Sequence, residues 1–259
     1  MSQRFRDAVS NGRPLLSVYM TAGFPQLDDT VRLARTLQDA GADMLEIGMP
    51  FSDPVADGPV IQSASEVALE NGMTIELLFR QLESLRSSVS IPVFLMGYWN
   101  PVMQFGPKRF VNDCMVAGVD GLILPDLPLE EYCATFQSDV ERAGLAYAGM
   151  IAPSTSDSRV REIDSSVNGF LYAVSVSGVT GATGGFGEAQ LSYFKRLSDL
   201  DLRNPVIVGF GIHDAPTFSG ATAHSAGGIV GTAFIRHLRE HGLDVSRMRN
   251  FLNSIRPAG

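Results

Sequence analysis

Residues 45–59 read LEIGMPFSDPVADGP, an apolar strand that breaks at a glycine and runs into a loop rich in proline and acid. Side chains alternate along a strand, so Glu46 and Met44 face one side of the sheet while Leu45 and Ile47 face the other. In a closed parallel barrel, Glu46 would point into the interior near the carboxyl end of its strand. A lone carboxylate is costly there unless it is protonated, paired or used in chemistry. The stretch therefore predicts a barrel strand that carries a catalytic acid.

Seven further runs are strand-like, and most are near-continuously apolar, as is typical of strands covered on both faces. The eight predicted strands are Leu15–Met20, Asp43–Ile47, Pro92–Met96, Gly121–Leu124, Ala146–Ile151, Phe170–Ser175, Val206–Gly209 and Gly228–Gly231. Helical stretches lie between and around them, at Gln3–Val9, Asp28–Ala40, Ile75–Leu85, Lys108–Val116, Glu130–Ala143, Ala189–Leu197, Thr232–Glu240 and Val245–Ile255. This alternation predicts an α/β protein: a single (β/α)8 TIM barrel with an additional N-terminal helix, one domain over residues 1–259.

An open doubly wound sheet is the alternative fold for the same alternation. Dinucleotide-binding sheets of that type carry a G-x-G-x-x-G turn after the first strand. Here the chain has Thr21-Ala22-Gly23-Phe24-Pro25 at that point. The barrel is therefore the favoured fold.

Composition excludes several classes of partner. The net charge of −8 without a basic cluster argues against nucleic acid and against anionic membrane surfaces. The first residues lack the apolar core of a signal peptide, and no stretch approaches the length of a membrane span. The two cysteines, Cys114 and Cys133, have no metal-ligand spacing. We expect a cytoplasmic enzyme with two unpaired thiols.

The carboxyl ends of the predicted strands gather acids, aromatic residues and glycines, but no lysine. The only lysines, Lys108 and Lys195, lie in helical stretches, so a Schiff-base nucleophile is lacking. Among four histidines only His213 follows a strand closely, and we expect no metal. His237 and His241 share one helix face, which is typical of a solvated surface.

Glycine loops after the last two strands suit a phosphate group, because backbone N–H groups and a helix start can bind an anion there. These loops are Gly209-Phe210-Gly211 and Gly231-Thr232, with the Thr232 hydroxyl as a further donor. The alternative is that the glycines only make tight turns. A third glycine-rich loop, Gly178–Gly187, suits a lid over the site, or an ordinary surface loop.

Glu46 and Asp57 form a possible acid–base pair on opposite sides of a small organic substrate. An apolar barrel mouth should raise the pKa of Glu46, so that it exchanges a proton near neutral pH. Asp57, on a loop, should stay ionised and balance a developing positive charge. The alternative for both Asp57 and Asp53 is that they cap turns around Pro54 and Gly58, and for Asp53 the catalytic and the structural role are equally favoured. Flat apolar walls would come from Tyr19, Tyr98, Ile123, Phe210 and Ile229, although each of these is equally typical of plain core.

The chain resembles the tryptophan synthase alpha subunit family from about Arg4 to Ile255. The most specific motif is the stretch 45–59, and the segments SGVTGA at 177–182 and GFGI at 209–212 are similar to the family's loop 6 and phosphate loop. The resemblance implies retro-aldol cleavage of indole-3-glycerol phosphate to indole and glyceraldehyde 3-phosphate.

The resemblance also implies residue roles. Glu46 would protonate the indole ring at its substituted carbon and help remove the side-chain hydroxyl proton. Asp57 would hydrogen-bond the ring N–H and stabilise the iminium-like intermediate, and Tyr172 matches an active-site tyrosine. Thr180 would order Asp57 when loop 6 closes. The phosphate would be held by Gly181, Gly211 and Thr232, and Gly231 would bind the substrate beside them.

A partner is implied in the same way. The family's alpha subunits bind a beta subunit that uses pyridoxal phosphate to join indole and serine, in an alpha2beta2 heterotetramer, and no cofactor is expected in the alpha chain. By resemblance the contact would include Pro50, Phe51, Asp53, Asn100 and Pro128.

Some positions depart from the family pattern. Thr232 stands where serine is usual, Gly227-Gly228 replaces an acidic residue before the last strand, and His213 replaces a small polar residue. Two alternatives to the synthase subunit stay open: a stand-alone lyase that releases free indole, and a catalytically silent regulatory subunit.

Overall fold

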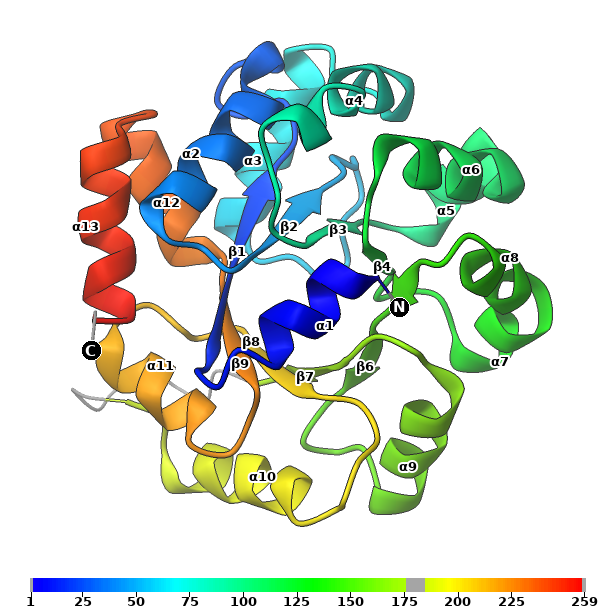
Figure 1. Cartoon of the computed structure of the whole chain (residues 1–259), viewed down its shortest axis with the longest axis vertical. Coiled ribbons are helices and arrows are strands. Elements are labelled where there is room, and N and C mark those ends of the chain that lie inside the picture. Colours follow the sequence, from blue (N-terminus) through cyan, green and yellow to red (C-terminus); the bar gives the residue numbers. More distant parts are fainter. Residues whose placement is uncertain (1, 176–184, 258–259) are drawn as a thin grey trace.

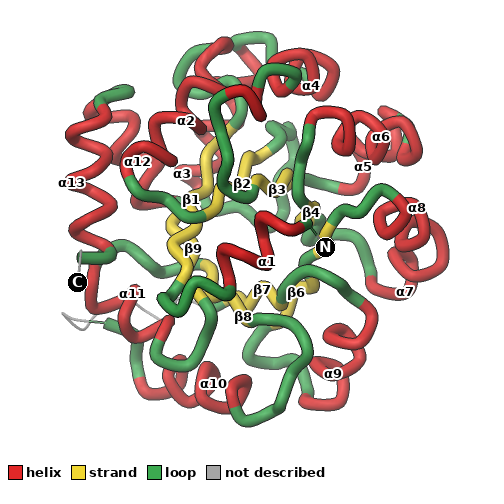
Figure 2. Tube along the Cα trace, viewed as in Figure 1, coloured by secondary structure: helices red, strands yellow, loops and turns green. Residues whose placement is uncertain are grey.

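A closed barrel of parallel strands forms the centre of the molecule (Figures 1 and 2), which is described by a computed structural model over residues 2–175 and 185–257. The strand segments run in the order β5-β4-β3-β2-β1-β9-β8-β7-β6, every pairing parallel. They are β1 (Leu15–Thr21), β2 (Met44–Gly48), β3 (Val93–Met96), β4 (Gly121–Ile123), β5 (Ala146–Tyr147), β6 (Gly149–Ile151), β7 (Leu171–Val174), β8 (Val206–Gly209) and β9 (Gly227–Val230).

The segments β5 and β6 are two halves of one strand that closes the barrel. Only Ala148 separates them, and its N–H donates to Leu122 O in β4 at 3.0 Å. The next N–H, from Gly149, donates to Phe170 O on the other side at 2.9 Å. In an ordinary strand, successive N–H groups likewise point to opposite neighbours. The described residues therefore form a barrel of eight strands, as the sequence predicted.

Helices surround the barrel on its outer side, except α1, which lies across one end of it (Figure 2). They are α1 (Gln3–Val9), η1 (Leu27–Asp29), α2 (Thr30–Ala40), α3 (Pro59–Glu70), α4 (Ile75–Leu82), η2 (Leu85–Ser87), α5 (Trp99–Phe105), α6 (Pro107–Ala117), α7 (Leu129–Glu131), the π-helical η3 (Tyr132–Phe136), α8 (Gln137–Arg142), α9 (Asp157–Ser166), α10 (Glu188–Ser198), α11 (Ala215–Thr222), α12 (Thr232–His241) and α13 (Val245–Ile255). Among the described residues, no helix is long and apolar enough to cross a bilayer.

Four of these helices, α3, α5, α9 and α11, were not among the predicted helical stretches. Their starts do carry sequence signals: Pro59 opens α3, and the side chains of Ser156 and Asp214 cap α9 and α11 by accepting backbone N–H groups. Their apolar stripes are short or interrupted by small residues, so periodicity alone did not reveal them.

The N-terminal helix α1 closes the amino-terminal end of the barrel. Its Phe5 side chain is fully buried, with ring centroids 5.2 Å from Phe94 and 5.8 Å from Phe170. Figure 1 shows α1 lying across the barrel axis. With that end plugged, only the carboxyl ends of the strands are open to a substrate.

The histidine pair on α12 departs from the sequence-based prediction. The ring of His237 stacks on Phe251 of α13 at 4.6 Å, and its Nε2 atom is buried without a hydrogen bond. Burial is the first cause that lowers the pKa of His237, followed by the nearby His241. The prediction of a solvated face is therefore wrong for His237, because α13 packs against that side of α12. Cys114 and Cys133 are both unpaired, as predicted.

Aspartates at the amino ends of alternate strands fix the register of the barrel. Asp43, before β2, accepts the Leu16 N–H at 2.9 Å while its own N–H donates to Leu16 O at 2.9 Å. Asp120, before β4, makes the same pair of bonds with Val93, each 2.8 Å long. Before β9, Ala226 donates to Val206 O at 2.8 Å but has no side-chain acceptor for the Val206 N–H.

Ala226→Asn should therefore stabilise the fold by about 1 kcal/mol, since an amide oxygen would receive the Val206 N–H. Asn168 supplies the precedent, because its Oδ1 accepts the Tyr147 N–H at 2.9 Å. Urea unfolding measures the change, and Asn168→Ala is the reverse comparison, expected to lose a similar amount. An Ala226→Asn variant no more stable than the parent chain contradicts this account.

Candidate active site

Glu46 lies in the interior of the barrel, as predicted. It is fully buried in β2, level with Tyr19 of β1 and Phe94 of β3. The Ser17 hydroxyl donates to Glu46 Oε1 at 3.1 Å, while Oε2 is buried and has no hydrogen-bond partner. Burial raises the pKa of Glu46 to about 8, and the Ser17 hydrogen bond opposes that rise. The site therefore holds a neutral carboxylic acid near neutral pH, with one oxygen left for a ligand.

This pKa makes stability depend on pH in a definite direction. Glu46 keeps its proton in the folded state up to about pH 8, whereas the unfolded chain releases it near its ordinary pKa of 4.5. The unfolded state binds fewer protons between these values, so stability falls as pH rises through that window. In urea unfolding, Glu46→Gln should gain about 2 kcal/mol over the parent between pH 6 and pH 8. A difference that does not change with pH contradicts the raised pKa.

Asp57 faces the site from the loop that follows β2. The Tyr98 hydroxyl donates to Asp57 Oδ2 at 2.8 Å, and the Ala56 N–H donates to the Tyr98 oxygen at 3.1 Å. Gln62 of α3 anchors the same loop, because its side-chain amide donates to Asp57 O at 2.9 Å. Partial burial raises the pKa of Asp57, while the Tyr98 hydrogen bond lowers it. Burial thus works against the ionised form expected from the sequence, and Tyr98 works for it.

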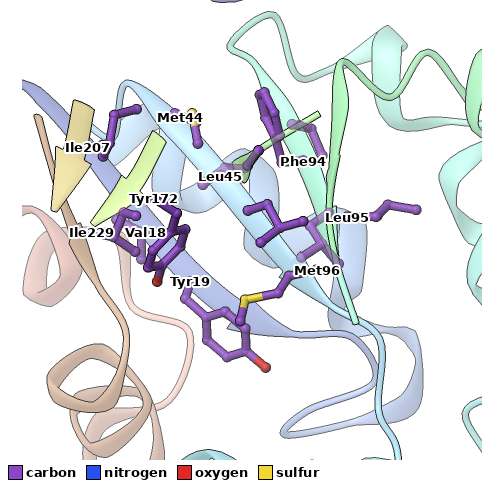
Figure 3. Packing of buried hydrophobic residues seen from close by; sticks show 14 of the residues in the cluster. Val18, Tyr19, Met44, Leu45, Phe94, Leu95, Met96, Tyr172, Ile207 and Ile229 are labelled. Atoms are coloured by element: carbon purple, nitrogen blue, oxygen red, sulfur yellow. The ribbon is translucent and has the colours of Figure 1, made fainter. Parts of the chain in front are cut away.

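Two tyrosines complete the interior beside Glu46. Tyr19 is packed so closely on Gly48 that a Cβ there would lie 2.1 Å from the tyrosine oxygen. A Cβ at Gly209 would lie 2.2 Å from Cε1 of the Tyr172 ring. Burial, reinforced by the charges of Glu46 and Asp57, raises the pKa of Tyr172 well above its ordinary value. Figure 3 shows both tyrosines among the packed side chains of the interior. Gly48 and Gly209 are therefore needed to seat these rings.

The remaining wall residues come from several strands. Ile123 of β4 and Ile229 of β9 are buried, and Phe210 packs edge-on against Tyr172 with centroids 6.3 Å apart. Both Phe210 and Gly211 have positive φ, at 69° and 78°.

The predicted phosphate residues are only partly described by the structure. Gly211 and Thr232 are exposed, Gly231 is partly exposed, and Thr232 is the first residue of α12. Thr180 and Gly181, with most of the loop Gly178–Gly187, lie outside the described residues. Gly209, predicted as part of the phosphate loop, has the additional duty of seating Tyr172.

The predicted partner residues lie on loops and helix starts beyond the carboxyl ends of the strands. Asp53, Asn100 and Pro128 are exposed, and Pro50 and Phe51 are partly exposed. The Phe51 ring packs against Tyr98 in a tilted arrangement, with centroids 5.4 Å apart. In the same loop, Val55 is 83% exposed and was not singled out from the sequence.

Four residues that position the site were not identified in that role from the sequence: Ser17, Gly48, Gln62 and Ser175. The Ser17 hydroxyl in β1 donates to Glu46 in the neighbouring strand β2, and the Ser175 hydroxyl donates to Phe210 O in the loop after β8. Contacts between different strands leave no signal in the local sequence. Gly48 is the exception, because a glycine at the end of an apolar strand is visible in the sequence. Within residues 2–175 and 185–257, no three histidine, cysteine or acidic side chains are grouped to hold a metal ion.

The fold and the site together define a TIM-barrel enzyme with a buried carboxylic acid, Glu46, in the interior of its barrel. Residues 5–254 match the family model described as tryptophan synthase alpha chain. The chain is 47% identical over 252 residues to the tryptophan synthase alpha chain of Flavobacterium psychrophilum, covering 97% of this chain and 99% of the relative. The identity to the Flavobacterium johnsoniae protein of the same name is also 47%, over 98% of this chain and 99% of the relative.

Solved structures give the same result. The tryptophan synthase alpha subunit of Legionella pneumophila str. Paris superposes with a TM-score of 0.86 at 32% identity, covering 98% of this chain and all of that one. A chain of tryptophan synthase from M. tuberculosis in its aminoacrylate-bound form gives a TM-score of 0.85 at 28% identity, covering 98% of each chain. The chain belongs to the tryptophan synthase alpha chain family. It is accordingly a lyase of tryptophan biosynthesis that cleaves indole-3-glycerol phosphate to indole.

Proposed function

We propose that Glu46 carries both proton transfers of the cleavage. In its neutral form it donates a proton to the indole ring carbon that bears the side chain, and the ring nitrogen becomes an iminium. The resulting carboxylate then takes the proton of the side-chain hydroxyl. The bond between the ring carbon and the hydroxyl-bearing carbon breaks, its electrons return to the ring, and indole and glyceraldehyde 3-phosphate leave. Glu46 ends the cycle protonated, as it began.

The observation that carries this proposal is the state of the Glu46 carboxyl group. It is fully buried, its pKa is about 8, and its Oε2 atom has no hydrogen-bond partner. A general acid works best when its pKa lies near the operating pH, and it must have an oxygen free to reach the substrate. Ser17 holds Oε1 and leaves Oε2 for that contact.

Asp57 is proposed to accept a hydrogen bond from the ring N–H and to balance the iminium charge. Its carboxylate is held by Tyr98 at 2.8 Å and by a loop that Gln62 anchors, so it is oriented before the substrate arrives. Fixed charge aimed at a developing opposite charge is a strong source of transition-state stabilisation. Tyr172, fully protonated beside Glu46, would contact the reacting side chain.

The rest of the substrate would be bound by walls and by backbone. The ring would lie among Tyr19, Tyr98, Ile123, Phe210 and Ile229. The phosphate would be bound by Gly211, Gly231 and Thr232, with Thr180 and Gly181 closing over it from a loop outside the described residues.

The partner is proposed to be the beta subunit of tryptophan synthase, in an alpha2beta2 assembly, with pyridoxal phosphate in the beta subunit and no cofactor in this chain. A partner would affect the catalytic residues directly if it bound at the predicted contact, which comprises Pro50, Phe51, Asp53, Asn100 and Pro128. Phe51 packs on Tyr98, and Tyr98 holds Asp57. A partner that fixes Phe51 would therefore fix the Asp57 carboxylate. We further propose a single domain acting in the cytoplasm.

Indole release from indole-3-glycerol phosphate, by the chain alone and with its cognate beta subunit, tests this proposal. Slow release that rises strongly with the partner supports it. Fast release by the chain alone favours an independent lyase. Substrate binding without cleavage in both cases indicates a silent regulatory subunit and overturns the proposal.

A further inference from the structure

The loop after β8 has a backbone conformation that other residues must hold. Phe210 and Gly211 follow one another with φ of 69° and 78°, in the left-handed region. Glycine adopts this region freely, but Phe210 does not, because its Cβ crowds the backbone there. The conformation of this loop therefore depends on contacts from outside it.

Ser175 supplies one set of these contacts from the residue that follows β7. Its hydroxyl lies 2.6 Å from Phe210 O and 3.1 Å from Gly209 O, and its N–H donates to Gly209 O at 3.1 Å. The serine is 2% exposed, so water does not compete for these bonds. A single buried residue thus binds two consecutive carbonyl groups of the loop.

His213 supplies the other contact from the far end of the same loop. Its Nδ1 atom lies 2.8 Å from Gly211 O, and an N–H at that position donates to the carbonyl. The backbone N–H of His213 donates to the Thr217 hydroxyl at 3.0 Å, which anchors His213 to the first turn of α11. All three carbonyl groups from Gly209 to Gly211 are therefore engaged on the side of Ser175 and His213.

Peptide geometry turns these contacts into an orientation of the N–H groups. In a trans peptide the N–H points opposite to the C=O of the same unit. Because the carbonyls of Gly209 and Phe210 both end on the Ser175 hydroxyl, the N–H groups of Phe210 and Gly211 leave in the same general direction, away from it. The Gly211 carbonyl points toward the His213 ring, so the Ile212 N–H of the same peptide unit points away from that ring. Successive N–H groups of this kind form an anion-binding concavity.

We propose that Ser175 and His213 are positioning residues that orient the N–H groups of Phe210, Gly211 and Ile212 toward the phosphate of the substrate. This rests on the proposed function for the identity of the ligand. Neither residue touches the reacting atoms; each acts through a backbone carbonyl. Because no lysine or arginine is among the residues assigned to the phosphate site, the orientation of these backbone dipoles carries much of the phosphate affinity.

The test compares binding with catalysis. Loss of one or two hydrogen bonds should weaken binding of glycerol phosphate about tenfold in Ser175→Ala and about fivefold in His213→Ala. The KM for indole-3-glycerol phosphate should rise by the same factors, with kcat within twofold of the parent. His213→Asn should restore affinity, because the amide nitrogen of asparagine takes the place of Nδ1.

The phosphate-free analogue indole-3-glycerol separates positioning from a general structural role. Its kcat/KM should not change in either variant, because no phosphate is there to be lost. Ser225→Ala is the matched control: Ser225 also bonds two carbonyls, Ala221 O at 2.8 Å and Gly227 O at 3.1 Å, at the opposite end of the barrel. It should leave glycerol phosphate affinity unchanged.

Parent-like glycerol phosphate affinity in both Ser175→Ala and His213→Ala overturns the proposal. So does an equal loss of kcat/KM with indole-3-glycerol, which would indicate only a damaged site. Titration of glycerol phosphate by calorimetry needs no turnover, so it tests the phosphate loop even in a chain that fails to cleave its substrate. Failure of the proposed function, in contrast, appears as absent indole release by the parent chain.

Discussion

Glu46→Gln should reduce indole release from indole-3-glycerol phosphate by roughly a thousandfold or more, at the upper end of what removing a general acid–base group costs. Glutamine keeps the shape of the side chain and can still accept the Ser17 hydroxyl at the position of Oε1. It cannot donate an acidic proton or take one back. Single-turnover indole release measures the loss, and binding of glycerol phosphate should stay within twofold of the parent.

Ser17→Ala is the matched control for this prediction. It removes the hydrogen bond that opposes the rise in the Glu46 pKa, but leaves the carboxyl group in place. We expect it to move the alkaline limb of the kcat/KM profile to higher pH while leaving activity near neutral pH within about tenfold of the parent. Turnover by Glu46→Gln within tenfold of the parent would remove Glu46 from the acid–base role.

The interior position of Glu46 could be predicted from the sequence, because strand alternation and burial on both faces leave a simple pattern. A charged residue within such an apolar run is visible without a structure. The identity of its partner is not, since Ser17 lies 29 positions earlier and meets Glu46 only through the register of β1 on β2.

Loop geometry was harder to predict than strand geometry. Asp57 was expected to stay ionised on its loop, because loops have no periodicity that reveals burial. The structure shows that Tyr98 and Gln62, from β3's end and from α3, bring it against the site. Likewise, the glycines of the loop after β8 were predicted as anion binders from their type, but Ser175 and His213, which shape that loop, come from segments whose contact no spacing rule predicts.

Asp57→Asn should lower kcat about a hundredfold while changing substrate affinity little, because only the charge that stabilises the iminium is lost. The asparagine oxygen can still accept the Tyr98 hydroxyl and the ring N–H of the substrate. Loss of charge should therefore appear in kcat rather than in KM. Steady-state and single-turnover indole release, measured at the same pH as the parent, separate the two.

Tyr98→Phe separates the effect of the Asp57 charge from the effect of the orientation of the Asp57 carboxylate. This variant keeps the carboxylate but removes the 2.8 Å bond that orients it, along with the acceptor for the Ala56 N–H. We expect about a tenfold loss in kcat in the parent chain and a much smaller loss once Asp57 is already asparagine, since contacting residues are not additive. Equal losses of kcat in both backgrounds would mean that Tyr98 acts independently of Asp57. A parental kcat in Asp57→Asn would exclude electrostatic stabilisation of the iminium by the Asp57 carboxylate.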